Sequence, residues 1–565
     1  MNEEERFKIT SNDYADLIVN QLMLPSILST FSDVSINRIN EIFSIVYLPV
    51  GYMEQNIIYE VGYTSIPKCY GLMSMKSYEP SESIHVYQNT ENELSGNGIL
   101  IGLVDTGIDY RNTVFQYSDH TSRIISIWDQ TINYGNDPEN YYFGTEFRQE
   151  DINAALSTGN PLSIVPSTDE IGHGTVMAGI AGGAYDVENG FIGVAPRTEF
   201  VIVKLKQAKP YLKDFFYLPQ DTLCYQENDI MLGINYLVET ASKLNRPITI
   251  CIGLGSSQGA HLGEGIFNNY LAAIGRLNNV ALVAAAGNEG SSGHHVYGEM
   301  SPTNNFNDVL LTVSNDNPGF FMEFWGNAPN IFTVEIFTPS DELIGRVPSV
   351  FLQGSTLYID YENTNIIVDN ILESSLGGDQ FMLYRIRNPL SGTWRFRVTA
   401  LGNLLSSYNM WLPINNFITE GTYFVNSNPY TTITTPGNEK IVLTVTAYNP
   451  QNQELYYAAS KGFTKDNQPK PDITAPGVNI LAPGIGNQYR YNTGTSVSAA
   501  YAAGTVALLQ EWGILRGNQY PLPSAKVRSI LTIGADRNTE YIYPNPDWGF
   551  GVINLSKSID IALRS

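Results

Sequence analysis

Short apolar runs that alternate with helix-like stretches constrain the fold of this 565-residue chain more than any other feature. Such continuous runs are typical of strands that are buried on both faces of a sheet. The runs are residues 99–104, 200–203, 248–252 and 280–284, and the helix-like stretches between them include 227–244 and 265–277. Strands that alternate with helices predict a parallel sheet with right-handed crossovers, so we expect an α/β fold with helices on both faces of the sheet.

The stretch 307–425 interrupts this pattern. Within it, apolar and polar side chains alternate with a period of two, and Gly, Pro and Asn turns separate the alternating segments, which is typical of an antiparallel β-sandwich. The α/β pattern returns with an apolar run at 440–445. We therefore expect the sandwich to be an insert within the α/β domain. The alternating segments are 332–337, 355–360, 381–386 and 393–398.

The first 73 residues predict a small α+β unit. Residues 42–49 have a strand-like pattern, and we expect 56–61 to be a partner strand. The chain opens with acidic residues and lacks the apolar core of a secretory signal, so we expect it to be made in the cytoplasm without a signal peptide. Because no apolar run reaches the ~18 residues that a bilayer requires, we expect no membrane span.

Composition limits the partners and the chemistry. The 32 basic and 56 acidic side chains give a net charge of −24, which excludes nucleic acid because phosphate binding needs a basic surface. Hydrophobic residues make up 43% of the chain, enough for a sizeable core. The three cysteines, Cys69, Cys224 and Cys251, cannot form a disulfide framework, so the fold should not depend on oxidation.

Two polar residues are candidates for a functional site, because one ends a predicted strand and the other precedes a predicted helix. Asp105, in Val-Asp-Thr-Gly, ends the strand predicted at 99–104, and ligands of open α/β sheets bind at the carboxyl ends of strands. The alternative is that Asp105 only forms a turn. His173 stands between two glycines just before a helix rich in small residues. Its alternative is an ordinary surface histidine at a helix start.

Ser496 and Asn288 complete the candidate set. Ser496 lies at the start of a predicted helix whose side chains are small and apolar on nearly every side. The free backbone N–H groups at the start of a helix favour negative charge. Asn288 ends the strand predicted at 280–284, where its side-chain amide could donate a hydrogen bond to an oxyanion. The alternatives are that Ser496 is only a helix cap and Asn288 only a turn residue.

Taken together, these segments resemble the subtilisin-like serine proteases, the subtilases. The resemblance rests on Asp-Thr-Gly, His-Gly-Thr-x-x-Ala-Gly, Ala-Ala-Ala-Gly-Asn-Glu-Gly and Gly-Thr-Ser-x-Ser-Ala-Ala, and on the order Asp, His, Ser. It implies that Ser496 is the nucleophile, His173 the general base and Asp105 the residue that orients the imidazole. It also implies an oxyanion hole made by Asn288 and the Ser496 N–H.

The same resemblance implies the substrate-binding residues. Gly253, Leu254 and Gly255 match the edge that pairs with an extended substrate by strand addition. A second set would line the pocket for the side chain before the cleaved bond: Ala284, Ala285, Ala286 and Gly287. The implied partners are a protein or peptide substrate and the chain's own cleaved pro-domain.

The resemblance also implies a domain plan. Residues 1–73 match a pro-domain that assists folding and is cut off near 71–75, although they could instead form a permanent N-terminal domain. The catalytic domain would comprise 74–306 and 426–565, and 307–425 would be a jelly-roll-like insert. We interpret the insert as a rigid brace, with a carbohydrate- or partner-binding module as the alternative.

The pro-domain, the missing signal peptide, the insert and the stretch 98–130, with Ile-Trp-Asp-Gln at 127–130, resemble the clostridial Csp germination proteases. This implies limited proteolysis of a spore cortex-lytic hydrolase zymogen and an association with spores. Two alternatives remain open: a general bacterial subtilase of broad specificity, and a protease-fold sensor or partner-binding protein held inactive by its pro-domain.

No cofactor is required by this chemistry, and no metal site is assigned. Subtilases often bind calcium through carboxylates and carbonyls, but no complete ligand set can be identified in this sequence. The adjacent His294 and His295 indicate a loop rather than a metal site, because neighbouring side chains point in different directions. Asp472, in Lys-Pro-Asp-Ile-Thr-Ala-Pro-Gly, matches a structural loop of the family rather than a catalytic one.

Overall fold

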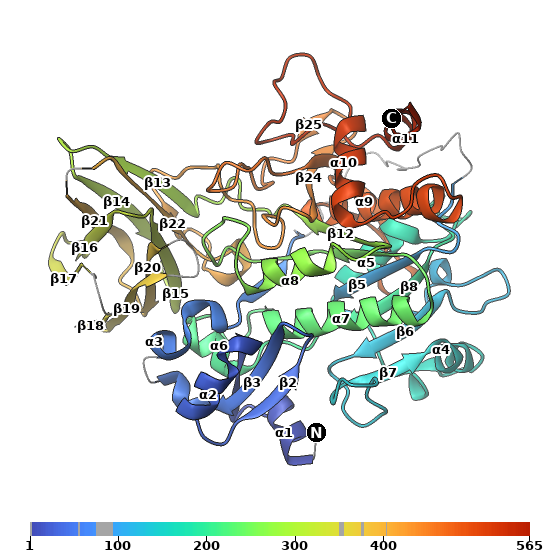
Figure 1. Cartoon of the computed structure of the whole chain (residues 1–565), viewed down its shortest axis with the longest axis horizontal. Helices are drawn as coiled ribbons and strands as arrows, with labels where there is room; N and C mark the ends of the chain where they lie inside the picture. The colour runs from blue at the N-terminus through green and yellow to red at the C-terminus, as the bar shows by residue number, and fades with distance from the viewer. Residues whose placement is uncertain are drawn as a thin grey trace.

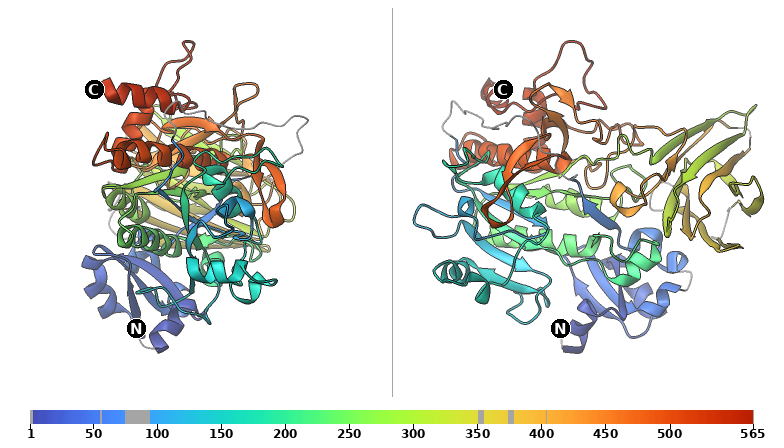
Figure 2. Two further views of the ribbon diagram at one scale, coloured as in Figure 1. Left: turned by 90° about the vertical axis from the view of Figure 1, so that its right-hand side faces the viewer. Right: turned by 180° about the vertical axis from the view of Figure 1, so that it is seen from behind.

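The computed structural model describes residues 3–54, 57–74, 94–349, 355–373, 378–402 and 404–564. Figure 1 shows an N-terminal α+β region at the bottom, an α/β region around a central sheet, and a β-sandwich at the left. Seen from behind, in Figure 2, the sandwich again extends from one end of the α/β region. The predicted fold class is confirmed: a mostly parallel sheet between helices, a small α+β region and an inserted antiparallel sandwich.

The central sheet is parallel except at its two edges. Its strands follow the order β25-β24-β12-β10-β5-β8-β6-β7, with β26 beside β24, and only β25 and β7 run antiparallel to their neighbours. The strands are β5 (Leu100–Asp105), β6 (Ile124–Asp129), β7 (Thr145–Arg148), β8 (Glu199–Lys204), β10 (Ile248–Ile252), β12 (Val280–Ala285), β24 (Leu443–Asn449), β25 (Glu454–Leu455) and β26 (Ile473–Pro476).

Helices cover both faces of this sheet. In β5, Ile101 and Leu103 pack into the core that contains α5 and α9, whereas Leu100 and Val104 pack into the core that contains α7 and α8. Apolar residues on both sides of one strand explain the continuous runs in the sequence. The helices are α4 (Gln149–Leu156), α5 (His173–Gly182), α6 (Pro210–Phe215), α7 (Glu227–Lys243), α8 (Ile266–Ile274), α9 (Thr495–Gln510), α10 (Ser524–Gly534) and α11 (Leu555–Arg564).

The N-terminal region contains an antiparallel sheet in the order β1-β3-β2. The strand expected at 42–49 is β3, but the partner strand expected at 56–61 is wrong. Ile57–Val61 is the helix α3, in which Ile57, Ile58 and Val61 are buried, so its apolar residues follow helical and not alternating spacing. The elements are α1 (Glu3–Thr10), β1 (Tyr14–Asn20), α2 (Leu24–Thr30), β2 (Ser35–Arg38), β3 (Phe43–Pro49) and α3.

The insert packs two antiparallel sheets face to face, in the orders β13-β22-β15-β20-β19-β18 and β17-β16-β21-β14-β23. Its first strand, β13, pairs with β22 and therefore belongs to the sandwich, although it lies before residue 307. The strands are β13 (His295–Met300), β14 (Phe306–Val313), β15 (Gly319–Gly326), β16 (Ile331–Phe337), β17 (Leu343–Val347), β18 (Ser355–Tyr361), β19 (Thr364–Glu373), β20 (Asp379–Arg387), β21 (Gly392–Leu401), β22 (Ser406–Trp411) and β23 (Tyr423–Phe424).

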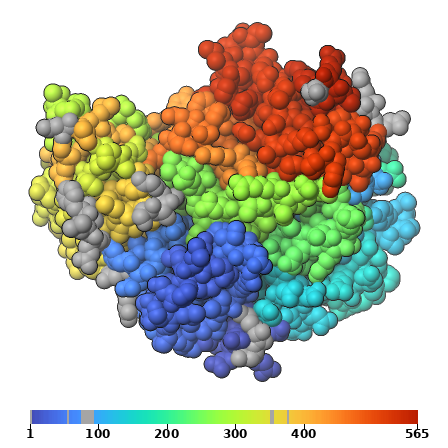
Figure 3. Space-filling model, viewed as in Figure 1, coloured from blue at the N-terminus to red at the C-terminus, as the bar shows by residue number. Residues whose placement is uncertain are grey.

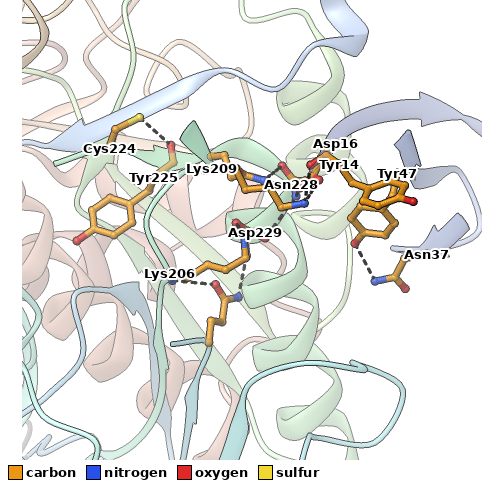
Figure 4. Close-up of polar contacts among 12 residues, drawn as sticks. Tyr14, Asp16, Asn37, Tyr47, Lys206, Lys209, Cys224, Tyr225, Asn228 and Asp229 are labelled. Carbon is orange, nitrogen blue, oxygen red and sulfur yellow. Dashed lines mark hydrogen bonds and ion pairs between the residues drawn. The ribbon is translucent and has the colours of Figure 1, made fainter. Parts of the chain in front are cut away.

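A buried lysine joins the N-terminal region to the α/β region. Lys209 Nζ, just before α6, donates to the carbonyl oxygens of Lys8 (3.2 Å) and Tyr14 (3.0 Å) and to Asp16 Oδ1 (2.6 Å). Figure 4 shows Lys209 against Asp16, with Asn228 beside them. In the space-filling view of Figure 3, the N-terminal region in dark blue lies directly against the α/β region.

The second oxygen of Asp16 is also fully used. Asp16 Oδ2 accepts hydrogen bonds from Gln226 Nε2 (2.5 Å) and Asn228 Nδ2 (3.0 Å). The Tyr211 hydroxyl accepts a hydrogen bond from the backbone N–H of Asp16 and donates one to the Asp16 carbonyl, at 3.0 Å each. A buried charge is tolerated only when it is paired and hydrogen-bonded, and Asp16 meets both conditions.

We expect Lys209→Met to loosen the N-terminal region, because it leaves the Asp16 carboxylate buried without a cation. Breaking a buried pair by removing one partner costs about 3–5 kcal/mol. Native-state hydrogen exchange of the β1 amides measures this loss. Lys243→Met, which removes an exposed pair with Glu139, is the control and should leave β1 protection almost unchanged. Equal protection of β1 in both variants would contradict the assignment.

Candidate active site

Three polar residues meet where one strand ends and two helices begin. Asp105 is the last residue of β5, His173 is the first residue of α5, and Ser496 is the second residue of α9. Because β5 is a central strand of a parallel sheet, its carboxyl end lies beside the helices that cover the sheet. The fold therefore brings together residues that are 68 and 323 positions apart in the chain.

These three side chains form one hydrogen-bonded chain. His173 Nδ1 lies 2.8 and 2.9 Å from the two carboxylate oxygens of Asp105, and His173 Nε2 lies 3.0 Å from Ser496 Oγ. All three residues are buried. In this arrangement the imidazole can accept the serine proton while the carboxylate stabilises the resulting imidazolium, which is the geometry of an activated serine nucleophile.

Asp169, which lies outside the sequence motifs, holds the loop before His173 in place. Its Oδ1 accepts hydrogen bonds from Thr106 Oγ1 and the Gly172 N–H, both at 2.7 Å. Its Oδ2 accepts from the N–H and hydroxyl of Thr175, at 2.9 and 2.7 Å. One buried carboxylate thus ties the start of α5 to the residue after Asp105. A polar residue shortly before a helix start was the only signal for it in the sequence.

Two glycines allow this close approach. A Cβ on Gly174 would lie 2.1 Å from the carbonyl oxygen of Gly107, so only glycine fits where α5 meets the loop after β5. A Cβ on Gly253 would lie 2.9 Å from His173 Cε1 and 3.3 Å from Ser496 Cβ. The glycines beside the catalytic motifs are therefore required by packing.

Asn288 lies next to the start of α9. Its Oδ1 accepts hydrogen bonds from the N–H of Thr495 (3.2 Å) and from the Thr495 hydroxyl (3.1 Å). Thr495 Oγ1 in turn accepts from the Gly287 N–H at 3.1 Å. Fixing Oδ1 in this way leaves the Nδ2 donor on the other side of the amide, where it can contribute to an oxyanion hole.

The predicted substrate edge is paired with the chain's own residues 69–73. Strand β4 (Cys69–Leu72) lies between β11 (Leu254–Gly255) and β9 (Tyr225–Gln226) in a three-stranded antiparallel sheet. Beyond β4, the Met73 N–H donates to the Gly253 carbonyl at 2.9 Å, and the Ser496 N–H donates to the Met73 carbonyl at 3.1 Å. Residue 75, at the end of the expected cleavage window, lies outside the described residues.

Two of the predicted pocket residues, Ala286 and Gly287, lie against Thr434, which is close to Met73. A Cβ on Gly255 would lie 3.0 Å from Met73 Sδ and 2.5 Å from the Thr434 hydroxyl, so these groups surround one site. The Thr434 N–H donates to the Ala286 carbonyl at 2.9 Å, and a Cβ on Gly287 would also meet Thr434. Ala284 and Ala285 are buried within β12, in the two cores on either side of the sheet.

The other residues noted in the sequence lie apart from this hydrogen-bonded chain. His294 Nδ1 contacts Glu289 at 3.0 Å, and His295 stacks on Trp411 with ring centroids 4.9 Å apart. Asp472 pairs with Lys470 and Arg528, at 2.7 and 2.5 Å. Among the residues that the structure describes, no three His, Cys, Asp or Glu side chains are grouped as metal ligands.

Burial and charge act in opposite directions on the catalytic histidine. Burial alone lowers the pKa of His173, but the charge of Asp105, the hydrogen bond to Asp105 and the charge of Asp169 together outweigh it, so the pKa is raised above its ordinary value. The imidazole therefore keeps its proton to a higher pH than a solvated histidine does. It can act as a base only above this raised pKa.

We expect the His173 ring to titrate above about 6.5, and Asp105→Asn to lower its pKa because both the charge and the charge-assisted hydrogen bond are lost. NMR titration of the histidine ring signals measures this, since the chain has only 6 histidines. The His173 signal is assigned by its loss in His173→Gln. A pKa that Asp105→Asn leaves unchanged would contradict the electrostatic coupling.

Comparisons with known proteins agree with this geometry. Residues 96–319 and 373–551 match the subtilase family, peptidase S8. The structure of the CspB protease of Clostridium perfringens is similar with a TM-score of 0.75 and 29% identity, covering 84% of this chain and 95% of that one.

Curated relatives match over shorter stretches. The C5a peptidase of Streptococcus pyogenes serotype M18 (strain MGAS8232) is 38% identical over 143 residues, which are 24% of this chain and 12% of the relative. The serine protease AprX of Bacillus subtilis (strain 168) is 31% identical over 156 residues, 24% of this chain and 33% of the relative. The chain thus spans a third or less of each of these relatives. The family match covers most of the chain and contains Asp105, His173 and Ser496; the protein belongs to the subtilase family of serine peptidases.

Proposed function

We propose that the protein is a serine endopeptidase that first cuts its own chain between Met73 and Ser74. The observation that carries the proposal is the position of residues 69–73, which pair with both β9 and β11 and bring the Met73 carbonyl to the Ser496 N–H. An extended peptide bound by strand addition in this register presents its carbonyl carbon to the nucleophile.

The proposed reaction follows from the contacts. Ser496 Oγ attacks the Met73 carbonyl carbon while His173 Nε2 takes the hydroxyl proton, and the Ser496 N–H with Asn288 Nδ2 stabilises the oxyanion. His173 then gives the proton to the nitrogen of Ser74, the peptide bond breaks, and residue 74 leaves as a free amine. Water hydrolyses the acyl-enzyme by the same route, with His173 as the base.

After this cut, the N-terminal region would remain in the cleft as an inhibitor. Besides the Lys209–Asp16 pair, Tyr63 stacks on Phe381 of the insert with ring centroids 4.3 Å apart, and its hydroxyl donates to the buried Glu323. The same contacts favour the second candidate function. In this alternative the protein is a protease-fold sensor or partner-binding protein that is held inactive by its N-terminal region. A new substrate can enter only after residues 69–73 leave.

For the physiological role, we propose limited proteolysis of a spore cortex-lytic hydrolase zymogen during germination, by a spore-associated protein. The similarity to the CspB protease supports this, because it extends over nearly the whole of that chain. Incubation with such a zymogen and, in parallel, with a denatured unrelated protein distinguishes the alternatives. One cut in the zymogen alone supports the proposal, and broad digestion of the denatured protein supports a general subtilase.

We expect Ser496→Ala to leave the chain whole, whereas the wild type yields a new N-terminus at Ser74. N-terminal sequencing and intact mass of the purified proteins measure this. Thr505→Ala, on the same helix but away from the triad, is the control for folding and should still be cut. An identical, intact N-terminus in wild type and Ser496→Ala would contradict self-cleavage.

Turnover in trans separates the two candidate functions. We expect wild-type protein treated to displace its N-terminal region to react with a fluorophosphonate and to hydrolyse peptides, because the nucleophile is hydrogen-bonded to its base. The same preparation of Ser496→Ala should do neither. Self-cleaved protein that never turns over a peptide would favour the inactive alternative.

A further inference from the structure

A segment that follows the last strand of the larger sandwich sheet covers the strand that occupies the cleft. We call residues 412–417 the roof segment. Its Ile414 and Phe417 are buried against Gly71, where an added Cβ would lie 2.6 Å from Ile414 Cδ1 and 3.3 Å from Phe417 Cε1. Asn416 Nδ2 also donates to the Leu72 carbonyl at 3.3 Å. The insert therefore contacts the bound chain at both residues.

The roof segment is fastened to both sides of the cleft. On the side of β11, Ser257 Oγ donates to the Leu412 carbonyl at 2.8 Å. On the side of the loop that carries Asn288, the Asn415 N–H donates to Glu289 Oε1 and Asn415 Nδ2 donates to the Asn288 carbonyl, both at 3.1 Å. Together these three bonds, of which the one from Ser257 is buried, oppose any retreat of the roof segment from a larger bound residue.

Gly71 is the third residue before the bond that we propose is cut. We propose that the roof segment makes the peptidase select substrates with glycine at this position. The inference rests on the proposed function, because it needs Met73 to precede the cleaved bond. Ile414 is only 1% exposed, so its terminal methyl group lies in the packed interior, and a side chain at the third position would have to displace it.

The residue before the glycine narrows the substrate class further. Tyr70 is wholly buried and meets the Phe267 ring edge-on, with centroids 5.5 Å apart. A fitting substrate is thus an exposed, extended protein segment with an aromatic residue, then glycine, then two apolar residues before the cut. The insert thereby has a part in substrate recognition, because its exit segment contacts the cleaved chain.

Self-cleavage of the full chain tests the selection of glycine. Gly71→Val should slow the cut after Met73 about tenfold or more, and Gly71→Ala should slow it less, because alanine adds one methyl group against the roof. Valine favours strands, so strand propensity alone predicts no loss. Gly51→Val is the matched control, since nothing lies within 4 Å of a Cβ at that position in the same N-terminal region.

Rescue separates the contact from a general folding defect. Ile414→Ala combined with Gly71→Val should restore most of the lost rate by opening space above residue 71. Ile336→Ala, in the core between the two sandwich sheets, is the matched control and should restore nothing. Equal self-cleavage rates for wild type and Gly71→Val, or rescue by both isoleucine variants, would overturn the selection of glycine. Neither result would affect the proposed function. A wild-type chain that stays whole would overturn the proposed function and this inference together.

Discussion

Backbone hydrogen bonding of an extended, buried segment organises the functional part of this molecule. A buried strand must satisfy its N–H and C=O groups, and β4 does so on one edge with β11 and on the other with β9. That pairing sets the register, and the register brings the Met73 carbonyl to the Ser496 N–H. The proposed self-cleavage, the proposed inhibition by the N-terminal region and the covering of Gly71 all depend on the same strand.

The triad itself depends on how strand and helix ends meet. Asp105 ends a strand that is covered on both faces, and α5 and α9 both begin at its carboxyl end. Asp169 joins the loop after β5 to the start of α5 through four hydrogen bonds. The imidazole of His173, the first residue of α5, is therefore held in position before any substrate binds. Preorganisation of this kind is what makes a serine hydroxyl reactive, because no rearrangement is needed during the reaction.

The insert is more than an appendage of the catalytic region. It contacts the N-terminal region through Tyr63 and Glu323, and it contacts the cleft through the roof segment. Because Glu289 binds both His294 and Asn415, the start and the end of the sandwich are attached to the loop that carries Asn288. A change in the insert can therefore reach the active site over a short path of polar contacts.

Local sequence patterns were enough to predict the fold class and the residues Asp105, His173 and Ser496, because buried strands and glycine-flanked motifs can be recognised without a structure. The strand predicted at 56–61 was wrong, because a short apolar run such as Ile57–Val61 fits a helix as well as a strand. No sequence motif pointed to Asp169. The contacts of Ile414 and Asn416 with Gly71 and Leu72, residues about 340 positions away, became visible only in the folded chain. Such contacts have no local pattern, because they arise when distant segments pack into one cleft.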